Sequence, residues 1–260
     1  MKVNKIKIIG FGVVLSAIFA ITNCGEKAAY DAITPVTDGA RVRFLHAVQG
    51  GPPIVVYANN KKWSAVLNSF ANGPDTIVYG GLFPANDYAV LPAGATNFEV
   101  KTANFANPPA TAVMSSSITL ENNKYYTVIA ADTLPSPRLV TISDDRLVVK
   151  SERKTYIRFV NLLTGGSATG YEFVLRRQGV LNTLSTPKYG ETGAVIELDP
   201  YFTTNTSNDS LFVRVPGTTT NLTAINLNGS TTTTLTANRL RTFILRGRPS
   251  NFGVSTIINN

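Results

Sequence analysis

Two stretches of the sequence decide the fold: residues 41–51, RVRFLHAVQGG, and residues 156–166, YIRFVNLLTGG. Each carries an arginine at the third position of an apolar run, each ends in a glycine pair, and the two lie 115 residues apart. The same offset aligns residues 120–129, LENNKYYTVI, with residues 235–244, LTANRLRTFI. Because one shift fits both ends of the region, the sequence predicts two copies of one domain.

The alignment between these anchors is less regular, as expected where loops differ in length. We pair Tyr79-Gly80 with Tyr189-Gly190, and residues 98–100 with residues 212–214. A short charged stretch at residues 150–154 is typical of a domain junction. The sequence therefore predicts one domain at residues 40–150 and a second at residues 151–260.

Composition and patterning indicate an all-β protein. Apolar residues make up 43% of the chain and charged residues 15%, which is enough apolar material for buried cores. Short runs rich in Val, Thr, Tyr and Phe alternate with Gly-, Pro- and Asn-rich turns, as in β-sandwiches. We expect two tandem immunoglobulin-like antiparallel β-sandwich domains, with other sandwich topologies left open. The expected strands are 41–48, 54–57, 76–79, 88–91, 97–101, 112–120, 125–131 and 138–142, then 171–175, 194–198, 210–215, 224–227 and 230–235.

One turn has a specific chemistry. Asn122-Asn123 joins two apolar runs, and asparagine tolerates a positive φ. The sequence predicts a tight hairpin there, and Ala237-Asn238 predicts the same solution in the second copy.

The N-terminus has the pattern of a secretion signal. Residues 1–7 carry three lysines, and residues 8–21 are almost purely apolar but too few to cross a bilayer as a helix. The lone cysteine, Cys24, follows directly. Residues 21–24, Ile-Thr-Asn-Cys, resemble the lipobox of bacterial lipoproteins, which implies cleavage after residue 23, lipid attachment at Cys24 and a flexible tether at residues 24–39. In that class Gly25 resembles the residue type that permits sorting to the outer membrane.

The competing interpretation is an ordinary cleaved signal with Cys24 as a bystander thiol. The nearest approach to its small-x-small site is residues 17–20. A single cysteine in an exported protein can form no internal disulfide, which favours lipid attachment as its purpose.

Four segments of the first copy carry a family resemblance. Residues 43–47, 50–57, 79–81 and 91–94 resemble the family of the domain of unknown function 4397. The resemblance implies a secreted or lipid-anchored bacterial protein of the Bacteroidetes type, often with paired domains. It implies architecture and location but no activity.

Few residues are candidates for chemistry, and none forms a catalytic motif. His46 is the only histidine, and Asn161 replaces it in the second copy, so we expect a structural role for it. Arg43 and Arg158 occupy the same place in both copies, which favours pairing with a carboxylate or with carbonyl groups over ligand binding.

Two further candidates have a structural and a functional interpretation. The doublet Asp144-Asp145 is either an exposed turn or part of a calcium site, although no EF-hand spacing accompanies it. Trp63, the sole tryptophan, is either a packing residue or a ligand-binding aromatic. We expect no catalytic residue, no metal site and no cofactor.

Charge and motifs leave a binding protein as the leading hypothesis. The net charge is +8, but the lysines and arginines are scattered, unlike those of nucleic-acid-binding proteins, and we expect no nucleic-acid partner. We expect a non-enzymatic lipoprotein of the cell envelope, anchored in the outer membrane, that acts in binding, adhesion or assembly with a carbohydrate or an envelope protein as partner. The alternatives are an envelope glycoside-type hydrolase that uses paired carboxylates and a structural spacer. The sequence does not define the oligomeric state.

Overall fold

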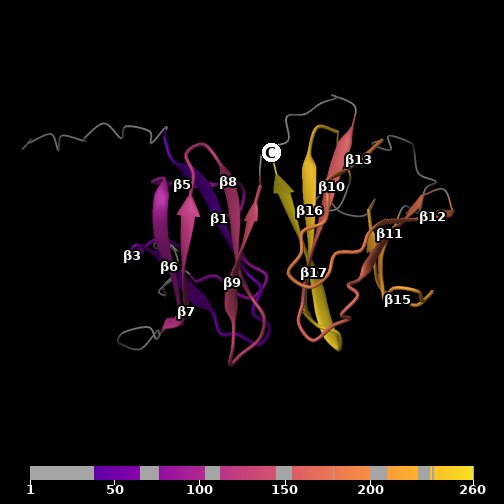
Figure 1. Cartoon of the computed structure of the whole chain (residues 1–260), viewed down its shortest axis with the longest axis horizontal. Helices are drawn as coiled ribbons and strands as arrows, with labels where there is room; N and C mark the ends of the chain where they lie inside the picture. The colour runs from indigo at the N-terminus through magenta and orange to yellow at the C-terminus, as the bar shows by residue number, and fades with distance from the viewer. Residues whose placement is uncertain are drawn as a thin grey trace, which may run out of the picture. The chain divides into compact units, whose positions relative to one another are not determined.

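The structure of the protein is a computed structural model, which describes residues 38–64, 76–102, 112–144, 154–177, 179–199, 210–227, 235 and 237–259. The predicted signal peptide, Cys24 and all of the tether except Asp38 and Gly39 lie outside these residues. Within them, the structure contains no helix long and apolar enough to cross a membrane. Residues 38–260 form one unit, drawn from indigo through magenta to orange and yellow (Figure 1).

Two sheets face each other in the first repeat, which we call repeat 1 (described residues 40–144). One has the order β4-β1-β8-β9, with β5 pairing β1 beside β4, and the other has the order β3-β2-β6-β7. The strands are β1 (Ala40–His46), β2 (Ile54–Ala58), β3 (Lys61–Lys62), β4 (Leu82–Phe83), β5 (Ala89–Leu91), β6 (Gly94–Thr102), β7 (Ala112–Leu120), β8 (Tyr125–Ala131) and β9 (Arg138–Ser143).

Repeat 2 (described residues 154–259) builds the same pair of sheets. Their orders are β13-β10-β16-β17 and β12-β11-β14-β15. The strands are β10 (Thr155–Leu163), β11 (Glu172–Arg177), β12 (Val180–Ser185), β13 (Ile196–Leu198), β14 (Ser210–Arg214), β15 (Asn221–Asn226), β16 (Leu240–Arg248) and β17 (Asn251–Asn259). The protein is thus all-β, with four sheets in two sandwich-like regions, as the internal repeat predicts. The boundary predicted at residues 150–154 lies almost wholly outside the described residues and stays a prediction.

The expected purely antiparallel pairing is wrong at one place in each repeat. β1 runs parallel to β8, with Arg41 opposite Tyr125, and β10 runs parallel to β16, with Tyr156 opposite Leu240. The first strand of each repeat therefore pairs with a strand far along the chain. Local sequence patterns do not reveal such a partner, because strand periodicity is the same in parallel and antiparallel sheets.

The predicted hairpin at Asn122-Asn123 is wrong for a related reason. Asn123 does adopt a positive φ of 60°, and Asn238 one of 64°. However, β7 pairs β6 whereas β8 pairs β1 and β9, so this turn carries the chain from one sheet to the other. The turn chemistry was predicted correctly, but it does not determine which strands pair.

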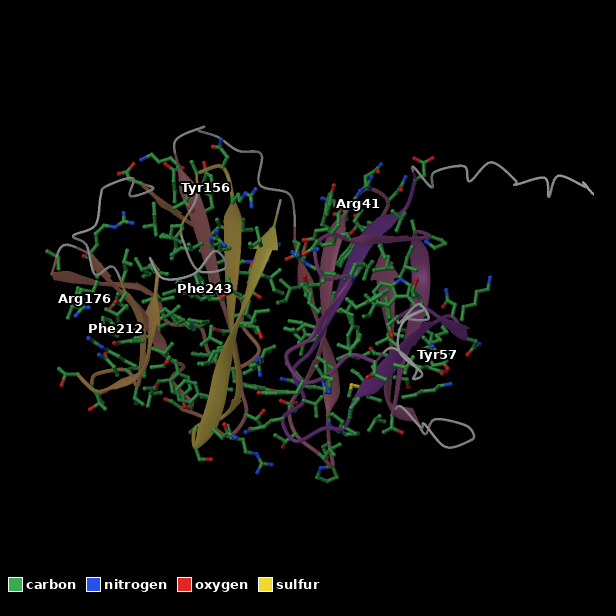
Figure 2. All side chains as sticks on the ribbon, turned by 180° about the vertical axis from the view of Figure 1, so that it is seen from behind. Arg41, Tyr57, Tyr156, Arg176, Phe212 and Phe243 are labelled. Carbon is green, nitrogen blue, oxygen red and sulfur yellow. The ribbon has the colours of Figure 1, made fainter. Side chains whose placement is uncertain are left out.

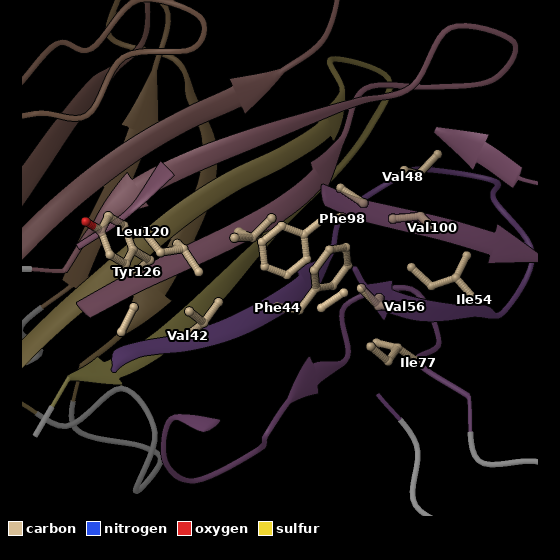
Figure 3. Packing of buried hydrophobic residues seen from close by; sticks show 14 residues of the cluster. Val42, Phe44, Val48, Ile54, Val56, Ile77, Phe98, Val100, Leu120 and Tyr126 are labelled. Carbon is tan, nitrogen blue, oxygen red and sulfur yellow. The ribbon is translucent and has the colours of Figure 1, made fainter. Parts of the chain in front are cut away.

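Three apolar clusters hold these sheets together. The first lies between the two sheets of repeat 1 and includes Val42, Phe44 and Phe98, which are fully buried (Figure 3). The second fills repeat 2 around Phe159, Phe173 and Phe243. The third joins both repeats and consists of Leu45, Ala47, Ile129, Ala131, Ile142, Val160, Leu162, Ile244 and Ile257. The first strand of each repeat is consequently buried on both faces, which explains its nearly continuous apolar sequence.

Two details of the predicted alignment differ from the structure. The expected strand at residues 76–79 forms only an isolated bridge between Ile77 and Ile54. In the middle of the repeats, Phe98 belongs to the core, whereas Phe212 lies beside Arg176 and outside the repeat 2 cluster, which instead takes up Leu211 and Val213 (Figure 2). Pairing Phe98 with Phe212 was thus one residue out of register, which in a strand exchanges the two faces. The expected strand at residues 230–235 lies outside the described residues except for Leu235.

Candidate functional site

Arg43 and Arg158 lie on the faces of β1 and β10 that turn toward the other repeat. The Arg43 Nε donates to Thr127 Oγ1 at 3.1 Å, and its Nη1 donates to the carbonyl oxygen of Ile258 at 3.1 Å. The Arg158 Nε donates to Thr242 Oγ1 at 3.2 Å, and its Nη1 donates to the carbonyl oxygen of Ser143 at 2.8 Å. Each arginine therefore bonds one threonine of its own repeat and one carbonyl group of the other repeat.

Asp144 connects the two arginines. Its Oδ1 accepts a hydrogen bond from Arg158 Nη2, and its Oδ2 lies 3.6 Å from Arg43 Nη2. Oδ2 also accepts hydrogen bonds from Thr127 Oγ1 and, at 3.1 Å, from the hydroxyl group of Tyr88. The structural interpretation of the arginines, pairing with a carboxylate and with carbonyl groups, is confirmed. The exposed turn suggested for Asp144 is wrong, since Asp144 is only 3% exposed, and Asp145 lies outside the described residues.

This arginine cluster, which comprises Arg43, Tyr88, Thr127, Asp144, Arg158, Thr242 and Asn259, buries two positive charges with one negative charge. Burial lowers the pKa of Arg43, and the nearby charge of Arg158 lowers it further, while Tyr88 and Asp144 oppose both effects. Burial raises the pKa of Tyr88, so its hydroxyl group stays protonated and can donate to Asp144. The Arg43 guanidinium also lies 4.2 Å from the centroid of the Tyr88 ring, a cation–π contact.

The repeat relates three pairs of residues in this cluster. The offset of 115 residues that pairs Arg43 with Arg158 also pairs Thr127 with Thr242 and Asp144 with Asn259. The repeat alignment therefore makes Asp144 and Asn259 equivalent positions, and the packing of the two repeats brings Asp144 to the arginines.

His46 has the structural role expected of it. Its Nε2 lies 3.1 Å from the carbonyl oxygen of Pro52, and the backbone N–H of Val48 donates to its Nδ1 at 3.4 Å. In repeat 2, Asn161 Nδ2 donates to the carbonyl oxygen of Pro187 at 3.0 Å, and Asn161 Oδ1 accepts from the backbone N–H of Leu163 at 3.0 Å. Both side chains accept from the N–H two residues further on and bond a proline carbonyl oxygen, although Pro52 lies between β1 and β2 and Pro187 between β12 and β13. These bonds require a donor and an acceptor but no acid–base chemistry.

The aligned glycines support the same equivalence. Gly80 N–H donates to the carbonyl oxygen of His46 at 2.7 Å, and Gly190 N–H donates to that of Asn161 at 2.7 Å. The pairing of Tyr79-Gly80 with Tyr189-Gly190 is therefore confirmed. Trp63 packs edge to face against Phe83 and Phe98, with ring centroids 5.4 and 5.7 Å apart, so its packing role is also confirmed.

Loops of both repeats gather where β1 and β10 end. This loop end consists of residues 47–53, 76–81, 132–137, 164–170, 187–193 and 248–250. Gln49 Nε2 donates to the carbonyl oxygen of Asn251 at 2.7 Å, Thr164 Oγ1 donates to Asp132 Oδ1 at 3.0 Å, and Arg248 Nη2 donates to Thr133 Oγ1 at 2.8 Å. These bonds cross between the repeats and hold the two sets of loops side by side.

Two arginine–tyrosine pairs flank the loop end, each formed across the repeats. The Arg246 guanidinium lies 4.1 Å from the ring centroid of Tyr79, and the Arg138 guanidinium lies 4.8 Å from that of Tyr189. Next to them, Val78, Tyr79 and Leu134 are 56%, 37% and 41% exposed. Leu134 also lines a small apolar depression together with Pro52, Met114 and Pro137. The loop end thus exposes apolar and aromatic surface beside positive charge.

The described residues contain no group of three or more His, Cys, Asp or Glu residues placed to hold a metal ion. Asp144, the carboxylate buried in the arginine cluster, is held by Arg158, Thr127 and Tyr88. This arrangement connects the two repeats, whereas the loop end presents exposed apolar and aromatic side chains and is therefore the candidate site for binding a partner.

Fold and site together define a duplicated β-sandwich protein whose two repeats share a buried polar interface. Residues 40–168 match the model of the family described as domain of unknown function 4397, DUF4397. The match spans repeat 1 and continues through β10 of repeat 2. A comparison with curated proteins gave no match.

Three solved structures are similar to the chain at low identity. A candidate cell adhesion protein from Bacteroides uniformis is 11% identical, with a TM-score of 0.29 over 85% of this chain and 98% of that one. A candidate adhesin from Bacteroides ovatus is 7% identical, with a TM-score of 0.27 over 85% and 95% of the two chains. A candidate cell adhesion protein from Bacteroides ovatus is 8% identical, with a TM-score of 0.22 over 85% and 97%.

Proposed function

We propose that the protein is a non-enzymatic lipoprotein of the cell envelope that binds a partner through the loop end. In this proposal residues 1–23 are removed as a signal peptide, Cys24 carries the lipid in the outer membrane, and the sandwiches are immunoglobulin-like. The basic head, the short apolar run and the single cysteine support the anchor. The partner is an envelope protein or a carbohydrate, for which exposed aromatic and apolar side chains are suitable.

The direction of the strands is the observation that carries the proposal. The described chain enters β1 at Ala40, and β1 runs from there to the loop end. At the beginning of β1, the Asn123 N–H donates to the carbonyl oxygen of Gly39, and Arg43 of the arginine cluster lies on the same strand. β10 runs the same way, because Thr164, directly after the end of β10, bonds Asp132 in the loop end. An anchor joined at Gly39 therefore leaves the loops of both repeats at the opposite end, where binding loops of sandwiches commonly lie.

Mass spectrometry of protein from its native host tests the anchor. We expect a mature chain that begins at Cys24 and carries a diacylglyceryl group. A chain with a bare Cys24 thiol, or with residues 1–23 still attached, would refute the lipoprotein assignment.

Binding measurements on a soluble fragment from Asp38 to Asn260 test the site. The fragment is screened against a glycan array and purified envelope proteins, and any partner is then measured with the variants Val78→Asp and Leu134→Asp. We expect each variant to weaken binding at least tenfold, since both place a charge on the exposed apolar surface.

The matched controls are Val180→Asp and Leu181→Asp, which alter side chains that are 59% and 48% exposed on the edge strand β12, away from the loop end. We expect these variants to bind like the parent protein. Equal losses in both pairs would place the binding site elsewhere. A screen without any partner would favour a spacer, and release of sugar from an array glycan would favour the hydrolase.

A further inference from the structure

We infer that the contact between the repeats is a two-fold interface in which Asp144 and Asn259 are interchangeable positions. Either repeat can then supply the buried carboxylate that holds both arginines. The inference concerns how the two domains recognise each other and does not depend on the proposed function.

Equivalent bonds cross the interface in both directions. Arg43 of repeat 1 donates to the carbonyl oxygen of Ile258, and Arg158 of repeat 2 donates to that of Ser143. Residues 258 and 143 are themselves 115 positions apart, as are the two arginines. A contact in which residue i meets residue j and the equivalent of j meets the equivalent of i is the defining property of a two-fold interface.

The residues that follow these carbonyl groups complete the symmetry. Thr127 Oγ1 donates to Asp144, and Thr242 Oγ1 donates to Asn259 Oδ1 at 3.2 Å. Asn259 Nδ2 also donates to the Tyr88 hydroxyl group at 3.2 Å, and Tyr88 in turn accepts a hydrogen bond from Arg43 and donates to Asp144. Asn259 is therefore linked to Arg43 through the Tyr88 hydroxyl group, whereas Asp144 bonds Arg158 directly.

The difference between the two positions sets the charge of the interface. With one aspartate, the interface buries two guanidinium groups and a single carboxylate, and Arg43 is the partner farther from it, at 3.6 Å. A carboxylate at position 259 could accept from Thr242 and, where Asp144 has been replaced, from the Tyr88 hydroxyl group, which also bonds Arg43, so its burial would be compensated. We therefore expect the protein to tolerate an aspartate at 259, and an aspartate there to replace the one at 144.

The test is a double-mutant cycle on the full chain, read as the midpoint of thermal unfolding. Asp144→Asn leaves two buried arginines without a carboxylate, and we expect the midpoint to fall by roughly 10 °C. In the double variant Asp144→Asn/Asn259→Asp we expect at least half of that loss to be recovered, because contacting positions couple. Absence of recovery would overturn the inference.

Two further variants keep the test decisive. Asn259→Asp alone is expected to leave the midpoint unchanged or to raise it, and a fall similar to that of Asp144→Asn would overturn the inference even if Asp144→Asn does not fold. The control is Asn221→Asp, which makes the same charge change in repeat 2 beside Arg214, where the Asn221 side chain accepts from Arg214 Nε at an exposed site. We expect Asn221→Asp to give no recovery in the Asp144→Asn background, and recovery of the same size would show a general charge effect instead.

Discussion

Repeat 1 carries an aspartate directly after β9, whereas repeat 2 carries an asparagine at the equivalent end of β17. Similarly, His46 in repeat 1 corresponds to Asn161 in repeat 2. In the second pair, different side chains accept from the N–H two residues further on, and each also bonds a proline carbonyl oxygen, in a different loop. In the first pair, the side chains accept equivalent bonds but differ in charge. The repeats thus share much of their hydrogen bonding, while among the described residues the buried carboxylate belongs to repeat 1.

Removal of Asp144 gives the largest expected effect. Asp144→Ala leaves Arg43 and Arg158 buried without a carboxylate, and loss of one partner from a buried ion pair typically costs about 3–5 kcal/mol. Asn259→Ala removes only neutral hydrogen bonds, for which we expect a loss of about 1 kcal/mol. Denaturant unfolding of both variants measures the difference. Similar losses would mean that the charge of Asp144 contributes nothing beyond its hydrogen bonds.

A smaller loss of stability is expected from replacing His46, whose equivalent in repeat 2 is Asn161. His46→Ala leaves the buried N–H of Val48 without its side-chain partner and removes the bond to the carbonyl oxygen of Pro52, and an unsatisfied buried group costs roughly 1–3 kcal/mol. His46→Asn installs the side chain that repeat 2 uses, so we expect it to retain most of the stability that His46→Ala loses. Urea unfolding checks the order, and an asparagine variant as unstable as the alanine variant would contradict the equivalence.

The same position predicts a pH dependence that only repeat 1 contributes. Burial lowers the pKa of His46 below its ordinary value of 6.5. In the window between the lowered pKa and 6.5 the unfolded chain binds the proton more readily than the folded chain, so stability is lost as the pH falls below about 6.5. Unfolding midpoints between pH 7.5 and 5 measure this loss. His46→Asn should remove the part due to His46, and an unchanged pH profile in that variant would assign the dependence to other groups.

Much of the fold could be predicted because it depends on local patterns and on the repeat. Strands β1, β2, β7, β8 and β9 lie close to their predicted ranges, and the offset of 115 residues placed Arg43 and Arg158 correctly. The parallel partner of β1 could not be predicted, because the segments that pair are about 84 residues apart. The alternation of residues in a strand does not show which other strand it pairs with. The burial of Asp144 depends on the packing of one repeat on the other, whereas the sequence around an acidic residue after a strand equally favours an exposed turn.

The smallest expected effect concerns the turns that lead into β8 and β16. Asn123 and Asn238 have φ values of 60° and 64°, and their N–H groups bond the carbonyl oxygens of Gly39 and Lys154 at 2.9 and 2.8 Å. Because a residue with a Cβ and no local side-chain bond is disfavoured in this conformation, we expect Asn123→Ala and Asn238→Ala each to cost about 1 kcal/mol. Asn123→Gly and Asn238→Gly should cost less, since glycine adopts a positive φ freely. Equal losses in the two repeats, measured by thermal unfolding, would show that the turns are equivalent in energy as well as in geometry, whereas a loss in one repeat alone would show that only that turn is strained by its sheet crossing.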